Sequence, residues 1–380
     1  MKDSIDTFLL GLNDLREFLR NAKRETALTA LMLREPRFSS VSEDEQCLIT
    51  AISKAGTEKR RYLYAVAIIG LYGLLERYMD SVLERYITLL SKSVSHYDQL
   101  PESVRKNHLP ASLELLKAIN DETYHGDADA ISVIANLHSC LSTPSTFRLN
   151  GDAFVFHRGN ISLDKIRGFF GSLGVMSPIR RLSLMPAFEK FFSESEPPRY
   201  PQSVSDDDLN LMLSPINDLV DRRNAIAHGV VDDIESVNLL LSRGDFLLAF
   251  VQAVHELLQH ELLPFEIAAP EVQALGQPID VFDGKIVCFE SSTCRLAVGD
   301  RIVAQTGDSL MPFRAGEVLD IQVNHVSYNQ LQPTEATKFC VKISFKARNN
   351  HSFFVLKPTN SRQSLQLSLT VPVGVETASA

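Results

Sequence analysis

The strongest helical pattern in this chain is centred on Tyr64-Ala65-Val66-Ala67-Ile68-Ile69-Gly70-Leu71-Tyr72-Gly73-Leu74-Leu75. This stretch is apolar nearly all round and lies at the centre of residues 58–91, which have strong helical periodicity. A helix without a polar face is normally buried inside a bundle of helices. Gly70 and Gly73 lower the helix propensity, but they allow a neighbouring helix, or a second copy of the chain, to approach closely.

The rest of the first 264 residues also predicts helices. Apolar residues in 3–22 recur at helical spacing, and further helices are expected over 102–119, 128–141, 162–173 and 182–192. Ser205 and three following aspartates predict a helix start, with Gly229 as its stop. Another helix is expected from Asp232 to Leu263, broken near Gly244. Between them, the Asn-Gly step in residues 147–157 predicts a small hairpin.

The pattern changes from helical to alternating after Leu263. Three prolines lie in or just before the segment that we predict to be a linker. Six short strands follow in about a hundred residues, which indicates a small all-β sandwich or barrel. The strand-like segments are 285–289, 301–304, 318–323, 339–345, 353–356 and 365–369. We therefore predict a multidomain chain with an α-helical domain over 1–264, a linker over 265–279, a β-rich domain over 280–372 and a flexible tail over 373–380.

Composition restricts the possible functions. The chain has 380 residues and a formal net charge of −9. Residues 271–380 hold ten basic and ten acidic residues, so the whole excess of acidic residues lies in residues 1–270. An acidic body repels nucleic acid at long range, which counts against a general coat protein but less against a site-specific nuclease. The chain begins with charged residues instead of the apolar core of a secretion signal, and the apolar run over 65–75 is too short to span a bilayer. We therefore expect a cytoplasmic protein without a membrane segment.

The five cysteines are odd in number and scattered, and this pattern fits no disulfide framework. No CxxC pair is present, so we expect no zinc site and no metal or other cofactor. The segment from His255 to His260 has its histidines five residues apart instead of four. They would diverge on a helix, which excludes the zinc-protease arrangement.

One segment carries chemistry: Arg223-Asn224-Ala225-Ile226-Ala227-His228, followed by Gly229. An arginine grips a phosphate with two parallel hydrogen bonds, and a histidine exchanges protons near neutral pH. RNA can be cut by its own 2′-hydroxyl when a base, an acid and a cation are supplied. One histidine cannot conveniently be acid and base at once, so two facing copies of the motif would complete the set. This predicts a homodimer through the motif-bearing helices.

The spacing of the two residues needs a particular geometry. Residues five apart on an ideal helix are rotated by about 140°, so Arg223 and His228 would not share a face. Arg223 must then reach round the helix, or the helix must end near Ala227, or the two groups must meet across two chains. Arg222 is a candidate substrate contact beside Arg223, with an ion pair to Asp218 or Asp221 as the alternative.

The pattern Arg-Asn-x-x-x-His, at the end of a helix in an all-helical domain, resembles the signature of the HEPN superfamily. Leu71-Tyr72-Gly73-Leu74-Leu75-Glu76-Arg77-Tyr78 is similar to the tyrosine- and glutamate-bearing helix of many members. The chain also looks like the RiboL-PSP-type branch. The resemblance covers residues 1–265, and only the short motif is specific.

The resemblance implies a metal-independent endoribonuclease that acts as a dimer in toxin–antitoxin, abortive-infection or antiviral systems. Arg223 and His228 would be catalytic, Asn224 an orienting group and Glu76 a polar neighbour of the cleft. An antitoxin or regulatory protein is an expected partner. Some related toxins carry a modifiable tyrosine two residues after the histidine. Val230 occupies that position here, so that mode of silencing is not expected.

Two other interpretations remain open. Short patterns of this kind arise by chance, so the motif could be an exposed arginine pair and a histidine that caps helix carbonyls. Alternatively, the chain could be a catalytically inactive HEPN-like scaffold that binds a nucleotide, RNA or a protein. The net acidity and the single histidine favour that alternative.

Overall fold

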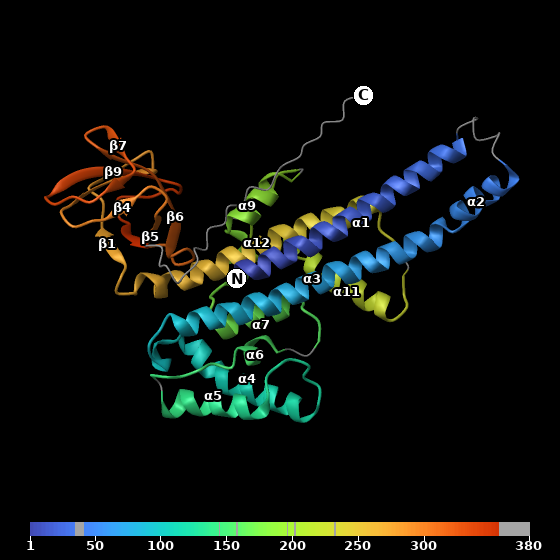
Figure 1. The fold of residues 1–380 in the computed structure, drawn as a ribbon, viewed down its shortest axis with the longest axis horizontal. Coiled ribbons are helices and arrows are strands. Elements are labelled where there is room, and N and C mark those ends of the chain that lie inside the picture. Colours follow the sequence, from blue (N-terminus) through green and yellow to red (C-terminus); the bar gives the residue numbers. More distant parts are fainter. Residues whose placement is uncertain are drawn as a thin grey trace. The chain divides into compact units, whose positions relative to one another are not determined.

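The structure is a computed structural model that describes residues 1–34, 42–143, 145–156, 159–195, 197–200, 203–231 and 233–356. The chain divides into two compact units, and the main boundary in the sequence lies between Phe265 and Glu266. The first unit is helical and the second is rich in strands (Figure 1). The predicted fold class, a helical N-terminal region followed by a small all-β region, is confirmed.

The first unit is built from helices of very different lengths. Their bounds are α1 (Lys2–Arg34), α2 (Glu43–Lys54), α3 (Gly56–Lys92), η2 (Tyr97–Gln99), α4 (Glu102–Asn120), α5 (Ala130–Ser142), α6 (Gly151–Val155), α7 (Leu163–Leu173), α8 (Pro178–Ser183), α9 (Pro186–Ser193), α10 (Asp206–Met212), α11 (Pro215–Ala227) and α12 (Val237–Ile267).

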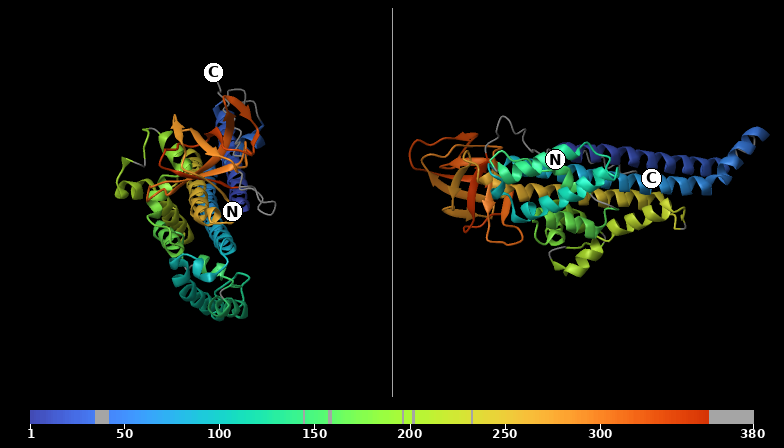
Figure 2. Two further views of the ribbon diagram at one scale, coloured as in Figure 1. Left: turned by 90° about the vertical axis from the view of Figure 1, so that its left-hand side faces the viewer. Right: turned by 90° about the horizontal axis from the view of Figure 1, so that it is seen from below.

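Helices α1, α3 and α12 run side by side and supply much of the helical core (Figures 1 and 2). Gly244 lets α12 approach α1 closely, because a Cβ added there would lie 3.3 Å from Cδ1 of Leu12. The hydroxyl of Tyr78 on α3 donates a hydrogen bond of 2.9 Å to the carbonyl of Val251 on α12. Close packing and this buried bond fix the three helices against one another.

Helix α3 is not buried all round, contrary to the expectation from its composition. Its inward face includes Ala67, Ile68 and Leu71, which are buried. On the opposite side Tyr62, Val66 and Ile69 remain 72%, 52% and 51% exposed. Gly73 continues this side into open space, whereas Gly70 faces Leu15 of α1. The exposed apolar side of α3 therefore has no partner among the described residues of this chain.

Several predicted elements differ in the structure. The expected helix from Ser205 to Gly229 is interrupted between α10 and α11, because Pro215 has no N–H to continue the first helix and instead occupies the first turn of the second. Helix α12 is continuous through Gly244, where a break was predicted. The close contact with α1 favours glycine at this position without ending the helix.

Other differences involve shorter segments. The predicted helix 182–192 is two helices, α8 and α9, joined at Leu184 and Met185 with Pro186 opening the second. The predicted hairpin over 147–157 is wrong for its described part, because residues 151–155 form helix α6. Asn150 precedes this helix with its side chain buried and bonded to Ser112 and Val133, so the Asn-Gly step is used for packing instead of a turn.

The second unit is a curled antiparallel sheet. Its strands are β1 (Gln273–Gly276), β2 (Asp280–Phe282), β3 (Ile286–Ser291), β4 (Leu296–Ala297), β5 (Arg301–Gln305), β6 (Phe313–Val323), β7 (Val326–Tyr328), β8 (Gln330–Leu331), β9 (Thr337–Ile343) and β10 (Ser352–Leu356). The main order is β1-β10-β5-β6-β9-β3-β2, with β7 paired to β6 and with β4 and β8 paired separately. The first half of β6 pairs with β5 and its second half with β9, so one long strand joins both parts of the sheet around a core that includes Phe289, Val341 and Phe353.

The boundaries between the units also differ from the prediction. Strand β1 lies inside the segment expected as a linker, and α12 extends into it as far as Ile267. The predicted strand over 365–369 and the predicted tail over 373–380 lie outside the described residues.

A disulfide joins Cys288 of β3 to Cys340 of β9, which corrects the expectation that the cysteines form none. The two residues are direct partners across the two strands, with their Cα atoms 4.0 Å apart. Pairs that face each other across antiparallel strands bring Cβ atoms together, and sequence separation gives no sign of such a register. Cys47, Cys140 and Cys294 are free.

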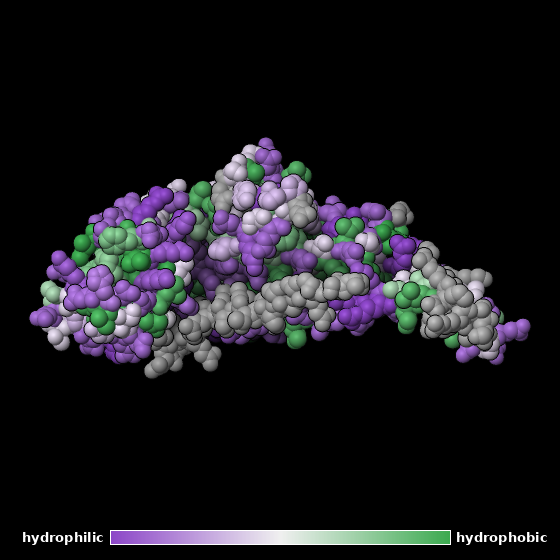
Figure 3. All heavy atoms as spheres, turned by 90° about the horizontal axis from the view of Figure 1, so that it is seen from above, coloured by the Kyte–Doolittle hydropathy of each residue, from purple (hydrophilic) through white to green (hydrophobic). Residues whose placement is uncertain are grey.

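Among the described residues, α12 is the one helix long and apolar enough to cross a membrane. Half of its most apolar window is buried within the protein, as is usual for the core helix of a bundle. The face of the molecule drawn in Figure 3 is largely hydrophilic, with hydrophobic residues scattered among polar ones.

Candidate functional site

The motif predicted to carry chemistry lies at the C-terminal end of α11. The helix ends at Ala227, and His228 is the first residue beyond it. Gly229 adopts a left-handed φ of +79° and donates to the carbonyl of Ile226, while the N–H of Val230 reaches back 2.8 Å to the carbonyl of Ala225. These two bonds satisfy helix-end carbonyls in the manner of a Schellman motif, which requires a residue that tolerates positive φ. Of the three geometries allowed by the spacing, the helix ends near Ala227.

Arg223 is half-buried and has two contacts that fix its position. Its Cζ atom lies over the ring of Tyr72 on α3, 5.4 Å from the ring centroid. Its Nη1 donates a hydrogen bond of 3.3 Å to Oδ1 of Asn224. A cation held over an aromatic face and bonded to a neighbouring amide loses much of its freedom. The remaining N–H groups of the guanidinium stay available to an anion.

A chain of hydrogen bonds extends from this arginine to Glu76. Oδ1 of Asn224 accepts from Nδ2 of Asn160 at 2.7 Å, and Oδ1 of Asn160 lies 3.3 Å from the hydroxyl of Tyr72. The Tyr72 hydroxyl also donates to Oε1 of Glu76 at 2.9 Å and accepts from the N–H of Ile161 at 3.0 Å. The structure therefore brings Arg223, Asn224 and Glu76 into one network.

Electrostatics in this network favour a neutral tyrosine. Burial raises the pKa of Tyr72 to about 12, with further contributions from the hydrogen bond and charge of Glu76, while the Ile161 N–H and the Arg223 cation act in the opposite direction. Tyr72 therefore keeps its proton at cellular pH and serves as a hydrogen-bonding platform instead of a base.

His228 lies beside this network in sequence but outside its hydrogen bonds. The residue is exposed, and its ring has no hydrogen-bond partner within the described ranges. Its backbone N–H bonds the carbonyl of Asn224 at 3.0 Å. The imidazole is thus accessible to solvent or to a ligand at the end of α11, as a group that exchanges protons must be.

The contacts of Arg222 differ from those of Arg223, the next residue in the chain. Its Nε donates to Asp218 at 3.0 Å, its Nη1 to the Tyr64 hydroxyl at 2.8 Å and its Nη2 to Asp233 at 3.0 Å. The same guanidinium lies 3.4 Å from Glu235, which also pairs with Arg243. Because its donors are occupied by carboxylates and a phenol, the expectation that Arg222 contacts substrate is not retained. The alternative, an ion pair with Asp218, is the one found.

Sequence reasoning missed two members of the site. Asn160 lies in a connection far from the motif in the sequence, and no sequence pattern marks it. The sequence marks Tyr72 only as part of the helix that resembles other HEPN members, and its place two turns into an apolar run gives no sign of its contact with Arg223. A hydrogen bond from the Tyr72 hydroxyl to Glu76 could have been predicted, because residues four apart bring their side chains together on a helix.

A second cation approaches the end of α11 from α3. Nη2 of Arg61 lies 3.5 Å from the carbonyl oxygen of Gly229. This contact ties the exposed part of α3 to the turn that follows His228. No group of three or more His, Cys, Asp or Glu side chains suited to a metal ion is found in the part of the chain that the structure describes.

Comparison with protein families agrees with this helical architecture. A family model described as RiboL-PSP-HEPN matches residues 39–260, which include α11 and the Arg223–His228 segment. The chain belongs to the RiboL-PSP-HEPN family. No curated protein sequence matches the chain. The HEPN domain indicates a nuclease or RNA-related function, and its match ends before the strand-rich unit begins.

Proposed function

We propose that this HEPN protein is an endoribonuclease that cleaves RNA through attack by the 2′-hydroxyl, without using a metal ion. One observation carries the proposal: Arg223 is anchored by Tyr72 and Asn224 at the end of the same helix that presents the exposed His228. A fixed guanidinium is preorganised for the charge that develops on a phosphorane, and preorganisation is a large part of catalysis of this type.

In the proposed reaction the 2′-oxygen forms a bond to phosphorus and the bond from phosphorus to the 5′-oxygen breaks. A base takes the proton of the 2′-hydroxyl and an acid protonates the 5′-oxygen, which leaves a 2′,3′-cyclic phosphate and a 5′-hydroxyl. His228 is the proton-transfer group and Arg223 stabilises the phosphorane. Asn224 orients Arg223, and Glu76 acts as a positioning residue through Tyr72.

The active form is proposed to be a homodimer, because one His228 supplies only one proton-transfer group. The exposed apolar side of α3 supports this, since Tyr62, Val66 and Ile69 form a stripe at helical spacing that continues over Gly73. Glu76 extends the same stripe, and Tyr72 beside it carries Arg223. A second copy docked on this stripe would place two motifs near one symmetry axis.

The nuclease proposal is tested with RNA in EDTA. We expect cleavage that leaves 2′,3′-cyclic phosphate ends, lost in Arg223→Ala and in His228→Ala and retained in Arg60→Ala, an exposed arginine of α3. Absence of cleavage by a folded wild-type dimer would contradict the proposal. In that case the inactive scaffold, binding a nucleotide, RNA or a protein partner, becomes the better interpretation.

The dimer is tested separately. Ile69→Glu places a charge in the α3 stripe and should convert a dimer to a monomer in sedimentation velocity, whereas Ile131→Glu, at a position 80% exposed on α5, should not. A mixture of the Arg223→Ala and His228→Ala chains should regain part of the activity if both subunits contribute to one site. No recovery would indicate two independent sites.

We place this activity in the cytoplasm, as a toxin or anti-phage effector controlled by an antitoxin or another regulatory protein. This step rests on the family resemblance. Induced expression of the wild-type chain should arrest growth, and expression of His228→Ala to the same level should not. Equal arrest by both chains would overturn the toxin assignment.

A further inference from the structure

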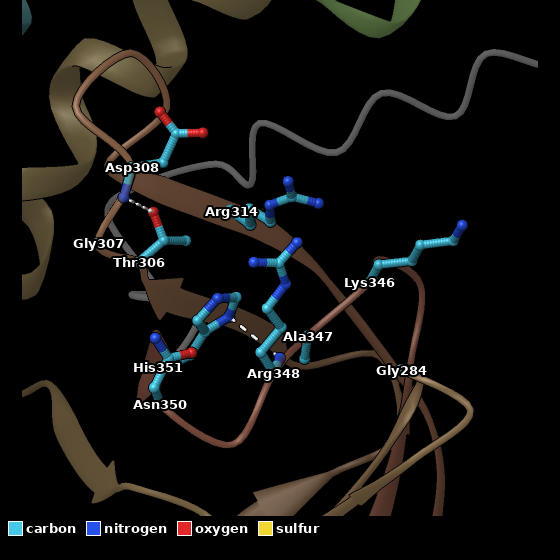
Figure 4. A pocket seen from close by; sticks show the side chains of 10 residues that line it. All are labelled: Gly284, Thr306, Gly307, Asp308, Arg314, Lys346, Ala347, Arg348, Asn350 and His351. Carbon is cyan, nitrogen blue, oxygen red and sulfur yellow. Dashed lines mark hydrogen bonds between the residues drawn. The ribbon is translucent and has the colours of Figure 1, made fainter.

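The strand-rich unit contains a cavity of about 550 Å³ that the nuclease proposal does not use (Figure 4). Its walls come from the end of β5, from β6, from the turn before β3 and from the loop between β9 and β10. Cavities of this size suit small molecules. Three of its lining residues are cations, namely Arg314, Lys346 and Arg348, and one, Asp308, is an acid.

The placement of Arg314 follows from the register of the sheet. Arg314 of β6 pairs with Ala304 of β5, and Ala304 pairs with Phe353 of β10. Residues directly opposite one another in an antiparallel sheet share a face, so Arg314 lies on the face that carries the buried Ala304 and Phe353. The side chain of Arg314 is itself exposed, so its guanidinium is accessible to a ligand as well as to water.

The loop between β9 and β10 brings the other two cations to the same place. It is closed by a hydrogen bond of 2.7 Å from the N–H of Ala347 to the carbonyl of Gly284 and by one of 3.1 Å from the N–H of His351 to the carbonyl of Arg348. Figure 4 shows Arg348 and Lys346 extending from this loop beside Arg314. No ion pair of these three cations is found within the described residues, whereas Arg301 in the same unit pairs with Glu266 at 2.7 Å.

His351 forms a buried, uncharged part of the wall. Burial lowers the pKa of its imidazole, and the cations of Arg314 and Arg348 lower it further. Its Nδ1 accepts a long hydrogen bond of 3.4 Å from the N–H of Arg348, so a neutral ring carries its proton on Nε2. The ring is therefore a further hydrogen-bond donor at the cavity.

From this geometry we infer that the cavity binds a phosphate group, carried either by a nucleotide-sized small molecule or by an RNA backbone. Converging cations that have no carboxylate partner among the described residues repel one another, and a bound phosphate relieves that repulsion through charge-assisted hydrogen bonds. Such a local excess of positive charge stands out in a unit whose sequence from residue 271 onward is neutral and in a chain of net charge −9. The inference does not depend on nuclease activity.

The test is calorimetric titration of the full chain carrying His228→Ala, so that RNA is not cut. The probes are inorganic phosphate, adenosine triphosphate in EDTA and a single-stranded RNA of twelve nucleotides. We expect binding of at least one probe, weakened about tenfold or more in Arg314→Gln/Arg348→Gln, since both variant side chains lose their charge-assisted hydrogen bonds to phosphate. Arg295→Gln, an exposed arginine elsewhere in the same unit, is the matched control and should bind as the parent does.

The pattern among the probes identifies the source of the phosphate. Binding of phosphate and adenosine triphosphate with mutual competition supports a small-molecule site, and binding of RNA alone supports a backbone contact. Absence of binding by all three probes, or equal binding by the double variant, would overturn the inference. If thermal melting shows that the double variant is unfolded, Lys346→Gln replaces it with the same expectation. Loss of RNA cleavage in His228→Ala tests the nuclease proposal independently.

Discussion

The guanidinium of Arg223 lies over the ring of Tyr72, with Cζ 5.4 Å from the ring centroid. This contact connects the C-terminal end of α11 with the middle of α3, two segments some 150 residues apart in the chain. It also explains why Arg223 and Arg222, adjacent in sequence, have different surroundings. Arg223 lies against an aromatic face, while Arg222 is enclosed by carboxylates.

Two substitutions of Tyr72 separate its ring from its hydroxyl. Tyr72→Phe keeps the ring but removes the acceptor of the Ile161 N–H and the contact with Glu76, so we expect a loss of about 1–3 kcal/mol in stability and a smaller fall in cleavage per folded molecule than removal of the ring causes. Tyr72→Leu also removes the aromatic face, so kcat/KM should fall by about 5- to 30-fold, the equivalent of ~1–2 kcal/mol. Single-turnover cleavage and urea unfolding measure the two effects. Equal cleavage by the two variants would contradict a role for the ring.

Asn224→Asp tests whether the charge of Arg223 must remain free. The aspartate keeps the oxygen that accepts from Asn160 and Arg223, so the fold should be preserved. The added negative charge competes with a phosphate for the guanidinium, and we expect RNA cleavage to fall by about tenfold or more. Asp221→Asn, an exposed change on the same helix, is the control and should leave cleavage unaltered. Cleavage by Asn224→Asp at the parent rate would show that Arg223 is not the phosphate ligand.

Gly229→Ala tests the turn that presents His228. The residue has a φ of +79°, which an L-residue adopts at a cost of about 1 kcal/mol or more, although a Cβ there would meet open space. We expect stability to fall by that amount and cleavage to fall with it, since the backbone beside His228 must readjust. Gly168→Ala, at an exposed position within α7, should instead stabilise the protein by up to about 1 kcal/mol. Chemical unfolding distinguishes the two, and equal effects would show that the positive φ is not important.

Glu256 makes stability depend on pH. Burial raises the pKa of this α12 carboxyl from 4.5 to about 7, and the hydrogen bond from the N–H of Ala187 offsets only part of that rise. The folded protein therefore holds a proton that the unfolded chain releases above pH 4.5. The stabilisation is complete below that pH and is lost as pH rises to about 7. At ~1.4 kcal/mol per pH unit the loss is about 3 kcal/mol.

Glu256→Gln removes this dependence, because the amide resembles the protonated acid. Relative to the wild type, the free energy of unfolding of the variant should rise by about 3 kcal/mol between pH 4.5 and 7.5, measured by urea unfolding. His108 and His255, whose pKa values burial lowers to about 4, act in the opposite direction in both proteins and cancel from the difference. Glu114→Gln, on the exposed side of α4, is the control. A constant difference between variant and wild type would contradict a neutral Glu256.

The periodicity of each part of the chain could be predicted from local sequence. Apolar residues at helical spacing predicted most helices of the first unit, and alternation predicted five of the strands, because burial of one face is a local property of the pattern. The end of α11 could also be predicted, since Gly229 readily takes the left-handed conformation that closes a helix. The resemblance to the HEPN superfamily rested on the same short segment.

Contacts between residues far apart in the chain could not be predicted in this way, because they depend on how the elements pack. Asn160 and Tyr72 joined the site because α3, α11 and the connection before α7 pack together, and no local pattern encodes such long-range contacts. Continuity of α12 through Gly244 was settled by the close approach of α1, which outweighs the low helix propensity of glycine. Pairing of Cys288 with Cys340 was likewise settled by strand register. Local sequence preference favours a helix or a strand, whereas the free energy of packing determines which elements it contacts and where it ends.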